Sequence, residues 1–217
     1  MIWALGTRSY KAILVSLCVL ITIGAAPSGA EVSDDVYVAI GASETVGVGV
    51  SPTKRYANIV ARVCGWRPVV NGRSNEPSLN LHPNVSRATF VTWFVDVNNA
   101  RFETADAESK ASKLLDALSP MKTRAIVILV DPRGIPGLRF MPDITLERQL
   151  ILNDFIRREV VRRGLGLMTV GTSNVAPTLL QQDGIHPSIA GHAYLANLLT
   201  GVACKHTAHA EHTSAMK

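Results

Sequence analysis

Three side chains near the two ends of this sequence have the chemistry of a nucleophile, a base and an orienting acid. Ser43 stands in the glycine-rich segment 41–49, and Asp183 and His186 stand three residues apart near the carboxyl end. A serine hydroxyl reacts at neutral pH only when an adjacent base takes its proton. His186 is the candidate base, and Asp183 is the candidate carboxylate that fixes the tautomer of the imidazole. Taken by itself, Ser43 is better explained as a helix N-cap or turn residue, so the hypothesis depends on the distant Asp and His.

The segments between these residues alternate between strand and helix patterns. The run before Ser43 is short, apolar and bounded by glycine, which favours a strand buried on both faces. Strands that alternate with helices are joined by right-handed crossovers and pair in parallel. We therefore predict an α/β fold, a three-layer α/β/α sandwich with a parallel sheet. The expected strands are 36–40, 68–71, 88–95, 125–130 and 166–170, and the expected helices are 56–63, 105–118, 144–163 and 188–202.

The loops after three of these strands contain polar residues. Ser43 follows the first strand, residues 72–75 follow the second, and residues 96–99 follow the third. Open parallel sheets place their sites just beyond the carboxyl ends of the strands. The sequence therefore predicts that these three loops meet at one edge of the sheet.

Three segments resemble blocks of a known enzyme family. Residues 37–56, with Gly41-Ala42-Ser43-Glu44-Thr45, look like the first block of the SGNH (GDSL-type) hydrolases, and Asp183-Gly184-Ile185-His186-Pro187 resembles the last block. Val97-Asn98-Asn99 resembles the block that supplies the asparagine of the family. The resemblance implies the flavodoxin-like SGNH hydrolase fold and an ester hydrolase that uses neither metal nor cofactor.

The resemblance also implies a role for each residue of the site. Ser43, His186 and Asp183 are then the catalytic triad. The backbone N–H of Ser43, the backbone N–H of Asn75 and the side chain of Asn98 form the oxyanion hole, which stabilises the charge that builds on the carbonyl oxygen.

Three positions depart from the family pattern. Ala42 replaces an aspartate, which removes a polar support for the turn but no proton-transfer group. Asn75 replaces a glycine, and asparagine is among the few residues that tolerate the conformation glycine would take; Gly72 is a second candidate for that position. Asp96 replaces another glycine, and an ionised Asp96 that faced the carbonyl oxygen would oppose its developing charge.

The predicted function is that of a serine esterase that hydrolyses small acyl esters, either carboxylic esters or acetylated carbohydrates, through an acyl-enzyme. A lysophospholipid or an acyl thioester is an alternative substrate. Because of the three departures, a weakly active or non-catalytic binding module that keeps the fold is the competing hypothesis.

Residues 1–30 have the layout of a secretory signal peptide. Arg8 and Lys11 precede an apolar run at 12–26, and small residues follow it at 28–30. A retained signal anchor is the alternative, although the run is shorter than the roughly 20 residues that span a bilayer. We expect export to the periplasm or the extracellular space, one hydrolase-like domain at 31–204 and a polar tail at 205–217.

Composition limits the partners of the mature chain. Of the 22 basic residues, only Arg8 and Lys11 lie in the leader, so 20 remain against 17 acidic ones, and this net +3 is too mild to indicate nucleic acid. We expect a monomer that acts on a small-molecule ester and does not insert stably into a membrane once the leader is cleaved. Histidines at 206, 209 and 212 suggest a metal site, but a disordered tail is favoured because no second cluster completes a ligand set.

Two cysteines, Cys64 and Cys204, remain outside the leader. In an exported chain they form one disulfide or stay as two buried thiols, and the sequence does not decide between these alternatives.

Overall fold

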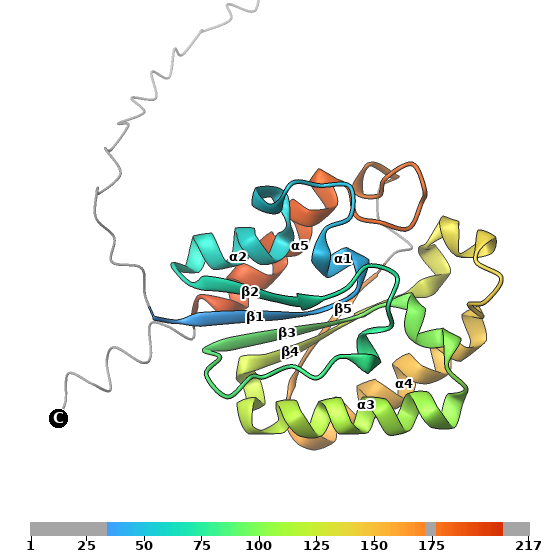
Figure 1. Cartoon of the computed structure of the whole chain (residues 1–217), viewed down its shortest axis with the longest axis horizontal. Coiled ribbons are helices and arrows are strands. Elements are labelled where there is room, and N and C mark those ends of the chain that lie inside the picture. The colour runs from blue at the N-terminus through green and yellow to red at the C-terminus, as the bar shows by residue number, and fades with distance from the viewer. Residues whose placement is uncertain (1–33, 172–176, 206–217) are drawn as a thin grey trace, which may run out of the picture. The chain divides into compact units, whose positions relative to one another are not determined.

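The computed structural model describes residues 34–171 and 177–205, and here five strands form one parallel sheet with the order β2-β1-β3-β4-β5 (Figure 1). The predicted leader and all but the first residue of the predicted tail lie outside the described residues. The strand order is that of flavodoxin-like folds. The strands are β1 (Val36–Gly41), β2 (Arg67–Gly72), β3 (Phe90–Val95), β4 (Ala125–Val130) and β5 (Gly166–Val170).

Helices cover both faces of the sheet. Figure 1 shows α2 and α5 together on one face and α3 and α4 on the other. This confirms the predicted three-layer α/β/α sandwich. The helices are α1 (Ser43–Val46), α2 (Tyr56–Cys64), α3 (Thr104–Leu118), α4 (Leu146–Arg163) and α5 (Ile189–Ala203), with short 3-10 helices η1 (Pro52–Lys54), η2 (Ser78–Asn80), η3 (Val97–Arg101), η4 (Ser119–Arg124), η5 (Pro132–Gly134), η6 (Pro136–Phe140) and η7 (Pro177–Leu179).

Successive residues of the central strands belong to opposite layers of the core. Val38 and Ile40 of β1 pack in the cluster that contains α3 and α4, whereas Tyr37 and Ala39 pack in the cluster that contains α2 and α5. This alternation follows from the two-residue period of a strand. The predicted burial of the first strand on both faces is therefore confirmed.

Some apolar residues of the predicted helices do not lie in the core. Val63, Ile189 and Leu198 are 60%, 56% and 37% exposed, although their spacing places them near the buried rows of α2 and α5. Each of these helices has only one face against the sheet, so a broad apolar stripe extends beyond the contact. In α4 the residues spaced by four, Leu152 and Ile156, are buried as predicted.

A disulfide joins Cys64, the last residue of α2, to Cys204, which follows α5. The two residues are 140 positions apart in the sequence. It ties together the two helices of one outer layer.

Candidate active site

Ser43 is the first residue of the one-turn helix α1, directly beyond the end of β1. The carbonyl oxygen of Ala42 accepts hydrogen bonds from the N–H groups of Thr45 and Val46 at 3.1 and 2.9 Å, which fixes the turn. Gly41 is required because a Cβ there would lie 2.1 Å from Thr45 Oγ1. The N-cap position is Ala42, so the interpretation of Ser43 as an N-cap is wrong.

His186 is held by the acid three residues before it. Asp183 Oδ2 lies 2.5 Å from His186 Nδ1, and Asp183 Oδ1 accepts the N–H groups of Ile185 and His186 at 2.9 and 3.0 Å. Partial burial raises the pKa of Asp183, but the bond to the His186 ring and the two backbone N–H groups outweigh it, so the net shift is downward. An ionised Asp183 therefore orients the imidazole through Nδ1 and leaves Nε2 for chemistry.

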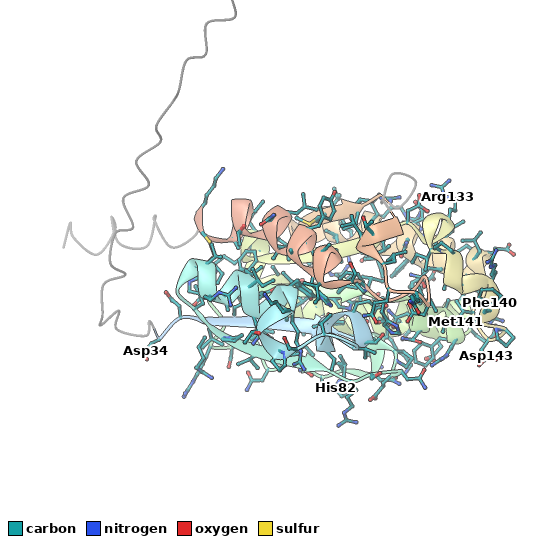
Figure 2. The ribbon with its side chains drawn as sticks, turned by 90° about the horizontal axis from the view of Figure 1, so that it is seen from above. Asp34, His82, Arg133, Phe140, Met141 and Asp143 are labelled. Carbon is teal, nitrogen blue, oxygen red and sulfur yellow. A yellow bond between two sulfur atoms is a disulfide. The ribbon has the colours of Figure 1, made fainter. Side chains whose placement is uncertain are left out.

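One cavity of about 240 Å³ joins four of the five predicted site residues. Its wall contains Ser43, Asn75, Asn98 and His186, and the fifth, Asp183, reaches it through His186. Met141, from the segment after η6, also borders the cavity. In Figure 2 Met141 lies at the end of the molecule opposite Asp34, which precedes β1, and this is the carboxyl edge of the sheet.

Asn75 adopts the backbone conformation that its position requires. Its φ is 61°, in the left-handed region. Arg101 holds it there, because Nη1 donates to the carbonyl oxygen of Asn75 at 3.1 Å and Nη2 donates to its Oδ1 at 3.0 Å. Gly72, the second candidate, is the last residue of β2 and pairs with Gly41, whose carbonyl oxygen would lie 2.4 Å from a Cβ at position 72. Gly72 thus serves strand packing, whereas Asn75 borders the cavity.

The carboxylate of Asp96 is occupied by donors of the surrounding loops. It accepts the N–H of Asn98 at 2.9 Å, the N–H of Ser78 at 3.0 Å and the side-chain amide of Asn99 at 3.2 Å. The oxygens of Asp96 cap η3 and fasten the loop before η2, and Asp96 is not among the residues that border the cavity with Ser43 and His186. Sequence reasoning missed this network, which fixes Asn98 beside Ser43.

The fold was compared with known proteins. No family model and no curated protein matches the sequence. Among solved structures, a lipase/acylhydrolase from Enterococcus faecalis is similar with 18% identity and a TM-score of 0.61, over 79% of this chain and 96% of its own. A structure from Desulfitobacterium hafniense DCB-2 that carries the name of the G-D-S-L lipolytic family has 14% identity and a TM-score of 0.62, over 77% and 98%. This chain has the SGNH hydrolase fold.

The psychrotrophic esterase EstA from Pseudoalteromonas sp. has the same fold, with 12% identity and a TM-score of 0.59 over 79% of this chain and 98% of its own. At identities this low, the similarity to these structures shows the fold and nothing about the chemistry. The chemistry has to be argued from the residues of this chain.

Glu44 is the residue of this candidate site that sequence reasoning overlooked. It is 5% exposed, and its Oε2 accepts the hydroxyl of Ser43 at 3.3 Å. Burial, and after it the charge of Asp96, raise the pKa of Glu44 to about 8. The position of Glu44 could have indicated this, because a carboxyl group directly after a serine in a buried turn is withdrawn from water.

A second, apolar cavity of about 60 Å³ adjoins the first. Glu44, Val97 and Ile185 border both cavities. Its other walls include apolar side chains at the ends of β3, β4 and β5 and on α5: Phe94, Val130, Val170 and Leu195. The candidate site therefore has an apolar recess that reaches Glu44.

His192, which follows the resemblance motif in α5, has a structural position. It is fully buried, its ring stacks on Tyr56 with centroids 6.1 Å apart, and its Nδ1 accepts the N–H of Tyr56 at 3.3 Å. Burial, then the charges of Arg55 and His186, lower the pKa of His192 to about 4. A neutral His192 thus caps the start of α2.

Within residues 34–171 and 177–205, no helix has the length and hydropathy needed to cross a bilayer. The same residues contain no group of three or more His, Cys, Asp or Glu side chains placed to hold a metal ion. The histidines at 206, 209 and 212 lie outside the described residues.

Proposed function

We propose that this chain is an exported serine esterase that hydrolyses small acyl esters through an acyl-enzyme. The observation that carries the proposal is the convergence of Ser43, Asn75, Asn98 and His186 on one cavity, with His186 oriented by Asp183. Segments that are distant in the sequence bring a serine, an oriented imidazole and two asparagines to the wall of one cavity. This set of groups is what acyl transfer needs.

In the first half of the reaction, the hydroxyl proton of Ser43 turns from Glu44 towards His186, and Ser43 Oγ attacks the ester carbonyl carbon. A C–O bond forms to Ser43 as His186 Nε2 takes the hydroxyl proton. The bond to the leaving oxygen then breaks, and His186 returns the proton to that oxygen, which leaves as an alcohol. Asp183 stays ionised and stabilises the imidazolium through Nδ1.

In the second half, water replaces the alcohol. His186 takes a proton from the water as its oxygen adds to the acyl carbon, and then passes that proton to Ser43 Oγ when the bond to serine breaks. The products are a carboxylic acid and the free enzyme. The N–H groups of Ser43 and Asn75 and the side chain of Asn98 are the proposed donors to the oxyanion in both halves, and each is worth about 3 kcal/mol of transition-state stabilisation.

The cavities favour esters with a small acyl group. The catalytic cavity of about 240 Å³ suits an ester with a small or extended alcohol part, and the recess of about 60 Å³ suits a short apolar chain. For comparison, an engineered apolar cavity of about 150 Å³ holds one benzene. Acetylated carbohydrates and short-chain carboxylic esters are thus preferred over lysophospholipids and acyl thioesters with long chains.

Export is part of the proposal. The leader-like segment 1–30 and the Cys64–Cys204 disulfide both support it, because disulfides persist in oxidising compartments. We propose a periplasmic or extracellular monomer that acts on a small-molecule ester.

The competing function is a binding module with little or no turnover. The specific observation in its favour is that the Ser43 hydroxyl bonds to Glu44 in the resting site. A similar structure, at 13% identity, is described by a title in which the active site of a carbohydrate esterase displays divergent catalytic and non-catalytic binding functions. Such a module would bind acetylated sugar without cleaving it.

The two functions are separated by assaying the secreted protein on p-nitrophenyl acetate, butyrate and octanoate beside Ser43→Ala. Ser51→Ala, at an exposed serine on the neighbouring loop, is the matched control. We expect turnover in the wild type and the control and none in Ser43→Ala. A fluorophosphonate probe should label the wild type, and His186→Ala should abolish labelling. Equal turnover in wild type and Ser43→Ala would favour the binding module.

A further inference from the structure

Glu44 is a buried acid in contact with the nucleophile, and the acyl-transfer steps leave it without a task. Its Oε2 lies 3.3 Å from Ser43 Oγ, and Glu44 borders both the catalytic cavity and the apolar recess. An acid at such a place has a strong effect on the serine proton in either of its ionisation states.

The charged and titratable groups that face Glu44 favour its neutral form. Asp96 approaches from the end of β3 and Asp183 from the loop before α5, and both are acids that raise the pKa of Glu44. Tyr56 approaches from α2, and burial raises its pKa to about 12, so it remains uncharged. His186 stands across the cavity. Among the described groups that shift the pKa of Glu44 there is no cation.

Asp96 and Glu44 differ in how their charge is supported. Three donors from other residues reach the carboxylate of Asp96, whereas Glu44 has its own backbone N–H and the Ser43 hydroxyl. Burial raises the pKa of Asp96 as well, but the bonds from Ser78 and Asn98 oppose that rise. Of two buried acids, the one whose charge has more donors ionises first. Glu44 is therefore the acid of the pair that stays protonated at neutral pH.

We propose that Glu44, as a neutral carboxylic acid, is a positioning residue for Ser43. We propose also that ionisation of Glu44 at alkaline pH lowers the activity of the site. The proposal rests on the esterase function above. A protonated carboxyl has an O–H as well as acceptor oxygens. The 3.3 Å contact, in which the Ser43 hydroxyl donates to Oε2, is reversed when the protonated carboxyl turns its O–H to Ser43 Oγ. The serine proton is then free to point at His186.

The ionised form has the opposite effect. A carboxylate only accepts, so it takes the hydroxyl proton of Ser43 in a charge-assisted hydrogen bond and turns it from His186. It also places a negative charge beside the oxyanion that forms during attack, which the site must stabilise. Both effects lower the rate once Glu44 loses its proton.

A role of Glu44 as the general base for Ser43 predicts the reverse dependence on pH. A base must be unprotonated, so the rate would rise as Glu44 ionises. The direction of the rate change between pH 7 and pH 10 therefore distinguishes positioning from proton abstraction.

The test compares wild type, Glu44→Gln and Glu147→Gln, a matched change at an exposed acid in the first turn of α4. The readouts are the rate of fluorophosphonate labelling of Ser43 and p-nitrophenyl acetate turnover from pH 6 to pH 10, with Ser43→Ala as the blank. We expect both wild-type rates to fall above about pH 8, approaching tenfold per pH unit. Glu147→Gln should behave like the wild type. Glu44→Gln, whose amide still donates to Ser43, should keep the pH 7 rates within about threefold and lose the alkaline decline.

The outcomes separate the inference from the proposed function. Turnover with the same alkaline decline in Glu44→Gln overturns the positioning role alone. No labelling and no turnover at any pH overturn the esterase function and the positioning role together. If Glu44→Gln does not fold, the wild type still decides, because rates that rise or stay level from pH 7 to pH 10 overturn the proposal.

Discussion

Arg101 holds Asn75 at two points. Its Nη1 donates to the carbonyl oxygen of Asn75 at 3.1 Å and its Nη2 donates to the Asn75 side chain at 3.0 Å. Asn75 has a φ of 61°, a conformation that costs most L-residues about 1–2 kcal/mol. The clamp from η3 thus keeps Asn75 in this conformation at the edge of the cavity, where its backbone N–H is the proposed oxyanion donor.

Arg101→Ala should lower kcat about 10- to 100-fold and change KM little, because a donor that is loosened loses part of the stabilisation that a deleted donor loses entirely. Ester turnover of the purified variant measures this. Arg73→Ala is the matched control, since Arg73 lies in the same loop, is exposed and pairs with Glu76. A loss of the same size in both variants would mean that the loop as a whole, and not the clamp, sets the rate.

Asn75→Gly should remain active, because glycine keeps the backbone N–H and adopts positive φ without strain. Asn75→Ala keeps the same N–H but should be less stable by about 1 kcal/mol. Urea unfolding and ester turnover of the two variants check this pair of expectations. An inactive but folded Asn75→Gly would assign the function of this residue to its side chain.

Asn98→Ala should lower kcat by about 10²- to 10³-fold, the usual effect of removing one side-chain donor from an oxyanion hole. Its fold should persist, because the hydrogen bond to Asp96 comes from the backbone N–H of Asn98. Asn80→Ala, at an exposed asparagine of η2, is the control. Unchanged turnover in Asn98→Ala would leave the oxyanion to the backbone donors alone.

The sequence predicted the layers and most of the candidate site because both depend on local patterns. Strands such as β4 and β5 were predicted with their observed bounds, since short apolar runs between glycine and proline signals are distinctive. Asn75 was predicted to tolerate the conformation of a glycine, and its φ of 61° confirms this. These are properties of a residue and its immediate neighbours.

What the sequence did not reveal depends on contacts between distant segments. Arg101 reaches Asn75 across 26 positions, and Ser78 reaches Asp96 across 18. Whether Asp96 faces the oxyanion depends on donors in another loop, and no pattern around Asp96 encodes them. The Cys64–Cys204 disulfide is a third case, because pairing needs the two cysteines to meet in space.

Removing that disulfide should destabilise the fold without changing the chemistry. The bond lies outside the cavity and closes a loop of 140 residues, for which the loss of stability is typically about 2–4 kcal/mol. A Cys64→Ala, Cys204→Ala double variant should therefore melt roughly 5–15 °C lower, at about 2–4 °C per kcal/mol for a chain of this size. Thermal unfolding followed by circular dichroism measures this, and an unchanged kcat at 25 °C is the companion expectation. A melting temperature equal to that of the wild type would show that the packing of α2 on α5 suffices.

His192 should make the stability of the fold depend on pH, with the loss of stability at acid pH. Burial lowers the pKa of His192 to about 4, below the value of about 6.5 in an unfolded chain. Its contribution is complete above about pH 6.5 and is lost as the pH falls towards 4, by up to about 3 kcal/mol. In His192→Phe the ring still stacks on Tyr56 but no longer accepts its N–H, so the variant should be less stable by about 1–3 kcal/mol at pH 8. The difference in the free energy of unfolding between the two proteins should then shrink from pH 6.5 to pH 4, because only the wild type must bury a charged imidazole. Urea unfolding at pH 8, 6, 5 and 4 tests this, and a difference that stays constant would mean that His192 remains in contact with water.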